Sequence, residues 1–141
     1  MMTIRDVIRD REPYFVQDKT TVLEAAQYMA ERKIGGVCVL SEDGRLVGIL
    51  TERDLLNRIV LHRRDPEGIP IKEAMSELQA VIETNDTPHE ALERMERTGR
   101  RHLPVVEGDR WVGMLSMRDL LRVELSEQGD ELKLLHEYIS H

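Results

Sequence analysis

The sequence predicts a mixed α/β fold of the α+β type, built from two β-α-β-β-α repeats that pack about a pseudo-twofold axis. The chain carries one motif twice, because residues 48–56 read GILTERDLL and residues 113–121 read GMLSMRDLL. The aligned segments 45–56 and 110–121 are identical at eight of twelve positions. A unit of about 60 residues buries too little apolar surface to be stable alone, so the two units are expected to pack face to face.

Composition narrows the classes of partner. The 141 residues carry a net charge of −7, which does not favour binding to nucleic acid or to an anionic membrane surface. No apolar run approaches the roughly 20 residues that span a bilayer. The single cysteine, Cys38, allows no intramolecular disulfide, and with no signal-like start the chain is expected in the reducing cytoplasm.

In the first repeat, a short apolar-spaced segment over residues 4–8 precedes the first strand. Thr21 followed by Glu24 is a capping-box signature, and it predicts a helix that stops before Gly35. The turn at residues 41–44 has the Asp-Gly chemistry of a hairpin. A helix is expected to open at Asp54. The predicted strands of this repeat are 14–16, 37–40 and 46–50.

The second repeat follows a polar linker over residues 62–69 and has the same order of elements. Residues 71–75 form a short apolar-spaced segment. Thr87, with Pro88 at the first helical position, predicts the next helix. A last helix is expected to open at Asp119. The predicted strands of this repeat are 80–82, 103–106 and 111–115.

We therefore divide the chain into repeat 1 (residues 1–65), repeat 2 (residues 66–125) and a C-terminal amphipathic helix (residues 126–141), which together form one compact module. The expected apolar face of the last helix either closes the module or forms a dimer seam. That face consists of Leu132, Leu135, Tyr138 and Ile139.

The repeated corner has two interpretations. Thr51-x-x-Asp54 and Ser116-x-x-Asp119 each have the form of a capping box, which needs no ligand. Each corner also follows a strand directly, at the end where crevices form in α/β layers. A carboxylate at that place can accept hydrogen bonds from both hydroxyls of a ribose. Both interpretations are compatible, because a cap holds the acid in position.

A second candidate feature is the basic cluster Arg100-Arg101-His102, which precedes Leu103-Pro104-Val105. Proline lacks a backbone donor, so within a strand it is expected at an edge or a bulge. Basic side chains at the mouth of a pocket beside such an edge suit a ligand that carries phosphate. The alternative is a solvated basic patch without a ligand. The corresponding stretch of repeat 1, residues 34–39, has small residues instead.

The two corners and the apolar-x-Pro strand resemble the cystathionine-β-synthase-type (CBS) domain family. Residues 48–54 and 113–119 match the family's Gly-apolar-x-Thr/Ser-x-x-Asp motif, and residues 102–105 match its apolar-x-Pro strand. The resemblance covers roughly residues 2–125, and it is closest to the stand-alone prokaryotic tandem pair called a Bateman module. It implies a regulatory sensor without catalytic activity that requires no cofactor and binds an adenine nucleotide (AMP, ADP or ATP).

The resemblance also implies two ligand clefts, each combining one repeat's central strand with the other repeat's corner. The aspartate would bind the ribose hydroxyls, the threonine or serine would contact ribose or phosphate, and apolar residues would enclose the adenine. The first cleft would use Ser76, Val81, Arg101, His102, Leu103 and Pro104 with Ile49, Thr51, Arg53 and Asp54. The second would use Phe15, Gly36, Val37 and Cys38 with Met114, Ser116, Arg118 and Asp119, and it departs from the family pattern at Gly36 and Cys38.

Several alternatives stay open from the sequence. The ligand could be S-adenosylmethionine or NAD(H), or the chain could be a ligand-free module that dimerises or docks on an unknown target protein. A metalloprotein or enzyme is disfavoured, because no two of the five histidines show the i, i+4 spacing of a helical metal site. The family resemblance implies a homodimer.

Overall fold

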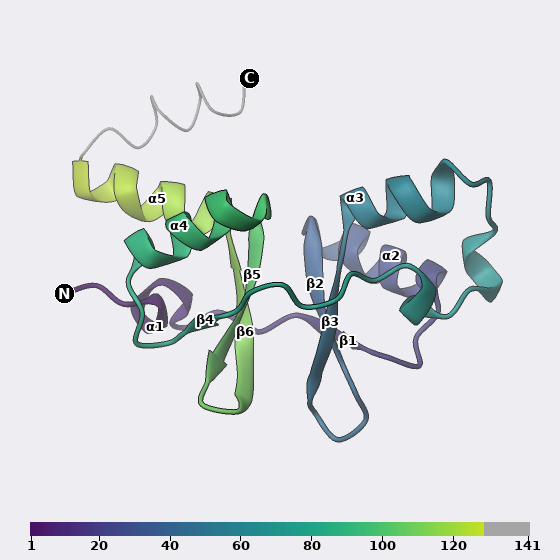
Figure 1. Cartoon of the computed structure of the whole chain (residues 1–141), viewed down its shortest axis with the longest axis horizontal. Coiled ribbons are helices and arrows are strands. Elements are labelled where there is room, and N and C mark those ends of the chain that lie inside the picture. Colours follow the sequence, from purple (N-terminus) through teal and green to yellow (C-terminus); the bar gives the residue numbers. More distant parts are fainter. Residues whose placement is uncertain (129–141) are drawn as a thin grey trace.

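The computed structural model describes residues 1–128 and has the mixed α+β fold that the sequence predicts, with two three-stranded sheets of the same topology (Figure 1). In each sheet the first strand runs parallel to the second, and the second pairs with the third in antiparallel fashion. The first sheet comprises β1 (Phe15–Gln17), β2 (Gly36–Leu40) and β3 (Leu46–Thr51). The second comprises β4 (Ile82–Glu83), β5 (His102–Glu107) and β6 (Arg110–Ser116).

The long helices begin where their caps predict. Helix α2 (Val22–Arg32) starts after Thr21, whose hydroxyl accepts from the Glu24 N–H, and helix α4 (Pro88–Thr98) starts after Thr87 in the same way. Helix α2 ends before Lys33, which adopts the left-handed conformation. Helix α4 ends before Gly99, whose φ of 69° favours glycine.

The helices at the two corners begin earlier than predicted. Helix α3 (Glu52–Leu55), which continues into a π-helical turn over Leu56–Val60, and helix α5 (Met117–Gln128) both start directly after the hydroxyl residue. The placement of the helix start at the aspartate was therefore wrong by two residues. Thr51 and Ser116 are the capping residues, and each aspartate is the third residue of its helix.

Strand β4 is also shifted from its predicted place at residues 80–82. Its pairing with β5 begins at Ile82 opposite Val105. In the first sheet the ladder starts one position earlier, at Phe15 opposite Cys38. The corresponding position of β5 is occupied by Pro104, which has no N–H to donate to a ladder. Pro104 consequently lies just beyond the end of β4, although β5 is the central strand of its sheet.

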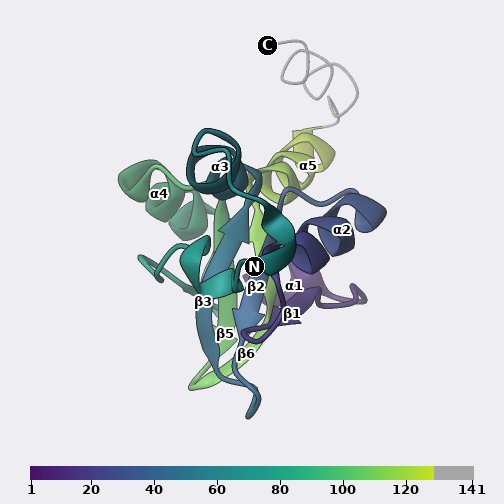
Figure 2. The same ribbon diagram turned by 90° about the vertical axis from the view of Figure 1, so that its right-hand side faces the viewer.

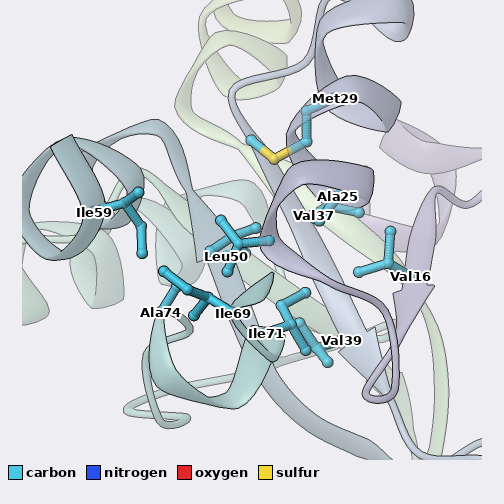
Figure 3. Packing of buried hydrophobic residues seen from close by; sticks show 11 residues of the cluster. Val16, Ala25, Met29, Val37, Val39, Leu50, Ile59, Ile69, Ile71 and Ala74 are labelled. Carbon is cyan, nitrogen blue, oxygen red and sulfur yellow. The ribbon is translucent and has the colours of Figure 1, made fainter. Parts of the chain in front are cut away.

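Each repeat contributes a short segment to the hydrophobic core of the other repeat. Ile4 of α1 (Ile4–Ile8) belongs to the core under the second sheet, with Ile82, Met95 and Leu103, and its N–H donates to the Asp86 carbonyl at 2.9 Å. Figure 1 shows α1 beside the second sheet. Conversely, residues 69–74 supply apolar side chains to the first core (Figure 3). This segment follows the 3-10 turn Pro66–Gly68 and includes the 3-10 turn Ile71–Glu73.

Alternation along the central strands places the cores on one face and the inter-sheet contact on the other. Val37 and Val39 of β2, and Leu103 and Val105 of β5, belong to the two cores. The intervening residues of β2 and β5 face the opposite sheet. Figure 2 shows the strands of both sheets overlapping along the middle of the molecule, with α3, α4 and α5 at the same end. The predicted helix over residues 126–141 lies largely outside the described residues, since α5 is described only to Gln128.

Candidate functional site

Two clefts lie where the sheets meet, and each contains one of the repeated corners. The cleft at Asp54, here called the Asp54 cleft, has a volume of about 590 Å³ and is also lined by Ser76, Arg101 and His102. The cleft at Asp119, the Asp119 cleft, has a volume of about 480 Å³ and is also lined by Gly36, Ser116 and Arg118. Both volumes are in the range of small-molecule sites.

Each cleft combines the corner of one repeat with the start of the other repeat's central strand. In the Asp54 cleft, residues 51–54 meet residues 98–102, which end α4 and begin β5. In the Asp119 cleft, residues 116–119 meet residues 33–36, which follow α2 and begin β2. Equivalent backbone bonds support the corners, from the Glu52 N–H to the Gly35 carbonyl at 3.0 Å and from the Met117 N–H to the Arg101 carbonyl at 2.8 Å.

Asp54 is held by three groups. Its Oδ2 accepts from the backbone N–H of Thr51 at 3.0 Å and lies 3.2 Å from the Thr51 hydroxyl, while its Oδ1 accepts from the Ser76 hydroxyl at 2.7 Å. Ser76 is brought there by a backbone bridge to Ile49 of β3, with N···O distances of 2.8 and 3.1 Å. Asp54 is only 6 % exposed, so the capping box fixes a carboxylate in the cleft wall.

Asp119 has the same cap but a charged second partner. Its Oδ2 accepts from the Ser116 N–H at 2.7 Å. Its Oδ1 accepts from Nη1 of Arg11 at 2.7 Å, and the side chains of Arg11 and Asp119 are 37 % and 10 % exposed. Sequence analysis did not identify Arg11, because it lies outside both motifs.

His102 and Glu52 line both clefts. A methyl group placed on Gly36 would lie 3.0 Å from Cδ2 of His102, so the small residue of β2 gives the imidazole its space. Burial lowers the pKa of His102, and Arg101 acts in the same direction, whereas Asp119 and Glu52 act against it. The imidazole is therefore kept closer to its neutral form between the clefts.

The charge of the lining differs between the clefts. The Asp54 cleft contains four arginines, Arg53, Arg58, Arg100 and Arg101, against the carboxylates of Glu52 and Asp54. The Asp119 cleft contains four cations against three carboxylates, and one of those cations is paired with Asp119. In a chain with net charge −7, the Asp54 cleft therefore concentrates positive charge suited to an anion.

Some predicted residues do not line either cleft. Leu103 and Val37 point into the two cores and are at most 1 % exposed. Val81 and Phe15 lie outside the linings, the latter packed edge-on against Trp111 at a ring-centroid distance of 5.5 Å. The other residues outside the linings are Pro104 and Cys38, which are buried on the strand faces between the sheets.

Cys38 is enclosed between the sheets. Its Sγ lies 3.6 Å from the Met114 Sδ and 3.8 Å from the Gly113 carbonyl oxygen. Burial raises the pKa of the thiol to about 12, so Cys38 is a packed apolar side chain rather than a residue of the cleft lining.

The remaining predicted residues line the clefts. For the Asp54 cleft they are Ile49, Thr51, Arg53, Asp54, Ser76, Arg101 and His102, and for the Asp119 cleft they are Gly36, Met114, Ser116, Arg118 and Asp119. Further lining residues have no motif to mark them, among them Gln79 and Arg58 in the first cleft and Lys33 and Tyr14 in the second. Their positions depend on the exchanged segments and helix ends.

Within residues 1–128, no group of three or more His, Cys, Asp or Glu side chains is arranged to hold a metal ion. None of the helices in that same range has the length and apolarity needed to cross a membrane.

Comparison with known proteins gives one family for both halves of the chain. The family model described as "CBS domain" matches residues 4–61 and again residues 71–126. The uncharacterized protein MK0525 of Methanopyrus kandleri is 33 % identical over 105 residues, which are 74 % of this chain and 54 % of that protein. The chain spans between 54 % and 60 % of the length of the first two curated relatives.

Solved structures agree in fold. A protein with CBS domains from Burkholderia ambifaria superposes with a TM-score of 0.83 at 27 % identity, covering 90 % of this chain and 96 % of that one. The CBS domain protein PAE2072 from Pyrobaculum aerophilum, solved in complex with AMP, gives a TM-score of 0.76 at 28 % identity, covering 84 % and 89 %.

Proposed function

The chain belongs to the CBS-domain family as a tandem pair, and from this premise we propose that it is a regulatory module that binds an adenine nucleotide. Proteins built on CBS-domain pairs are generally regulatory rather than catalytic, and the proposed role of this chain involves no reaction. The nucleotide would change its conformation or its affinity for a target protein. AMP, ADP and ATP are the proposed ligands, with the Asp54 cleft as the principal site.

The observation that carries this proposal is the fixed carboxylate of Asp54 opposite a concentration of arginines. Asp54 lies in the wall of the cleft, and Thr51 and Ser76 set its orientation. A carboxylate held in this way can accept from the two hydroxyls of a ribose, and it does not need to be reoriented when the ligand binds.

Arginines of both repeats line the same cleft. Arg100 and Arg101 precede β5, and Arg53 follows Thr51 on α3. Guanidinium groups bind phosphate oxygens in paired geometry. A nucleotide could therefore place its ribose at Asp54 and its phosphates among these arginines, with Ile49 contacting the base. The AMP complex of the Pyrobaculum relative supports a nucleotide over other anions.

Calorimetric titration with AMP, ADP, ATP, NADH and S-adenosylmethionine tests this proposal. Asp54→Asn keeps the shape of the cap but removes the charge, and it should weaken binding of the preferred ligand about tenfold to a hundredfold, the value of hydrogen bonds to a charged group. Asp109→Asn, in an exposed turn of β5–β6, is the control for net charge. The proposal fails if none of the five compounds binds, or if both variants bind equally well.

A second candidate function is protein interaction independent of ligand. Leu56, Val60 and Leu61, at the π-helical turn after α3, are 51 %, 61 % and 66 % exposed. Clustered exposed apolar side chains are typical of interaction surfaces, and a second copy of the chain would form the homodimer that the family resemblance implies. Light scattering should give a dimer mass, and Leu61→Asp should reduce it. A monomer mass at micromolar concentration would exclude self-association.

A further inference from the structure

The two corner aspartates differ in the group that donates to Oδ1, the carboxylate oxygen that takes no part in the cap. Asp54 Oδ1 accepts from the neutral hydroxyl of Ser76, and Asp119 Oδ1 accepts from the guanidinium of Arg11, each at 2.7 Å. Both carboxylates are largely buried. The clefts therefore differ in the charge of the group bonded to Oδ1 rather than in the exposure of the carboxylate. The same ligand would therefore meet two unequal acceptors.

Arg11 reaches Asp119 from a turn that is specific to the N-terminal segment. After α1, Asp10 adopts a φ of 63°, which is uncommon for a residue other than glycine, and the Arg11 N–H donates to the Ile8 carbonyl at 3.3 Å. In the Asp54 cleft the segment that approaches the corner is 75–77, and it contributes Ser76 through a backbone bridge to β3. The group that donates to Asp54 Oδ1 is thus the Ser76 hydroxyl, where Asp119 has the guanidinium of Arg11.

The two partners respond differently to a ribose. The Ser76 hydroxyl is neutral, and the second lone pair of Asp54 Oδ1 stays available while Ser76 remains bonded. Asp119 Oδ1 keeps a second lone pair as well, but its bond to Arg11 is charge-assisted, between side chains that are 37 % and 10 % exposed. The guanidinium offsets the negative charge of the carboxylate, so a ribose bonds more weakly at that oxygen until Arg11 is displaced. The remaining cations of this cleft, Lys33, Arg118 and Arg122, are opposed by Glu12 and Glu52, so they do not offset this loss as the arginines of the Asp54 cleft would.

We propose that Arg11 determines which cleft binds the nucleotide first, by competing with the ligand for Asp119. The Asp54 cleft fills first, and the Asp119 cleft fills only at a higher nucleotide concentration, when Arg11 is displaced. This inference rests on the proposed nucleotide-binding function of the clefts. It makes Arg11 a determinant of site selectivity that neither repeated motif contains.

The test weakens the Asp54 cleft with Asp54→Asn and measures AMP affinity at the Asp119 cleft by calorimetry. Adding Arg11→Ala should tighten the remaining site about threefold to tenfold, since a partly exposed ion pair no longer competes. Adding Arg9→Ala, which removes the same charge from an arginine paired with Asp6 instead, should leave the affinity unchanged.

Two other results would overturn the inference. If Arg11→Ala weakens AMP binding, Arg11 is a phosphate ligand rather than a competitor, and if Arg11→Ala and Arg9→Ala give equal affinities, the ion pair has no role in selectivity. Either result leaves nucleotide binding by the wild-type chain intact. Absence of AMP binding in the wild type and in Arg11→Ala alike is a different outcome, and it overturns the proposed function together with the inference.

Discussion

Replacing Gly48 with alanine should distort the Asp54 cleft, although Gly48 lies outside its lining. A β-carbon at Gly48 would lie 2.8 Å from the Met75 Sδ and 2.9 Å from the Ser76 carbonyl oxygen. The methionine side chain can turn away, but the carbonyl belongs to the segment that is bridged to Ile49. Gly48→Ala must therefore push residues 75–77 away from β3 and weaken two backbone hydrogen bonds.

The expected loss is about 1–3 kcal/mol in the free energy of unfolding, the usual result of inserting a methyl group into a packed site. For a chain of this length, each kcal/mol corresponds to a decrease in Tm of roughly 3–5 °C. Displacement of Ser76 should also remove one of the two residues that set the orientation of the Asp54 carboxylate, and so lower AMP affinity. Urea unfolding followed by Trp111 fluorescence measures the stability, and calorimetry measures the affinity.

The chain contains its own control for this experiment. Gly113 occupies the same motif position in the second repeat, but a β-carbon there would meet only Ile8 Cδ1, at an ordinary 3.5 Å. Gly113→Ala should therefore change the stability by less than about 1 kcal/mol in either direction. Equal destabilisation by the two substitutions, or a fully stable Gly48→Ala variant, would refute the reasoning from close approach.

Three further predictions follow from the buried groups. Because burial lowers the pKa of His102, the imidazole binds a proton more readily in the unfolded chain than in the native protein. The free energy of unfolding should therefore fall as the pH drops below about 6.5 toward the lower native pKa. His102→Gln should flatten this dependence, whereas His89→Gln, at an exposed position, should not. The Cys38 thiol, with its pKa raised to about 12, should react with a maleimide at pH 8 at least about a hundredfold more slowly in the native protein than in urea; similar rates would show that the thiol is accessible. Ile4→Ala and Ile71→Ala, both at fully buried positions, should each destabilise the protein by about 2–5 kcal/mol in urea unfolding, and a loss under 1 kcal/mol for either would contradict the exchanged packing.

Features encoded locally could be predicted from the sequence. Thr21 and Thr87 mark the starts of α2 and α4 because a capping box is formed within four residues. The hairpin strands follow from short apolar runs around a turn, and the repeated corners identified Asp54 and Asp119 as cleft residues. A capping box also fixes the helix start directly after its hydroxyl residue. The helices at the corners therefore begin two residues before the aspartates, where the sequence analysis had placed their starts.

Features that depend on contacts between distant segments could not be predicted in the same way. The apolar spacing of residues 4–8 shows that one face is buried, but not which sheet covers it. The start of β4 depends on a proline that lies more than 20 residues away in β5. Arg11 and Gln79 carry no signal for a cleft, because their positions are set by the path of the connecting segments.

The exchanged segments also bear on how the chain folds as it leaves the ribosome. Within the described residues, the buried side chains of the first core run from Val16 to Ala74, with Tyr14 and Met75 packed against them, so this core can close early in synthesis. Ile4 is made before any of its partners, which extend to Leu120. The first residues of the chain therefore remain unpacked until nearly all of the second repeat has emerged, and during that interval Ile4 must be kept from unproductive contacts.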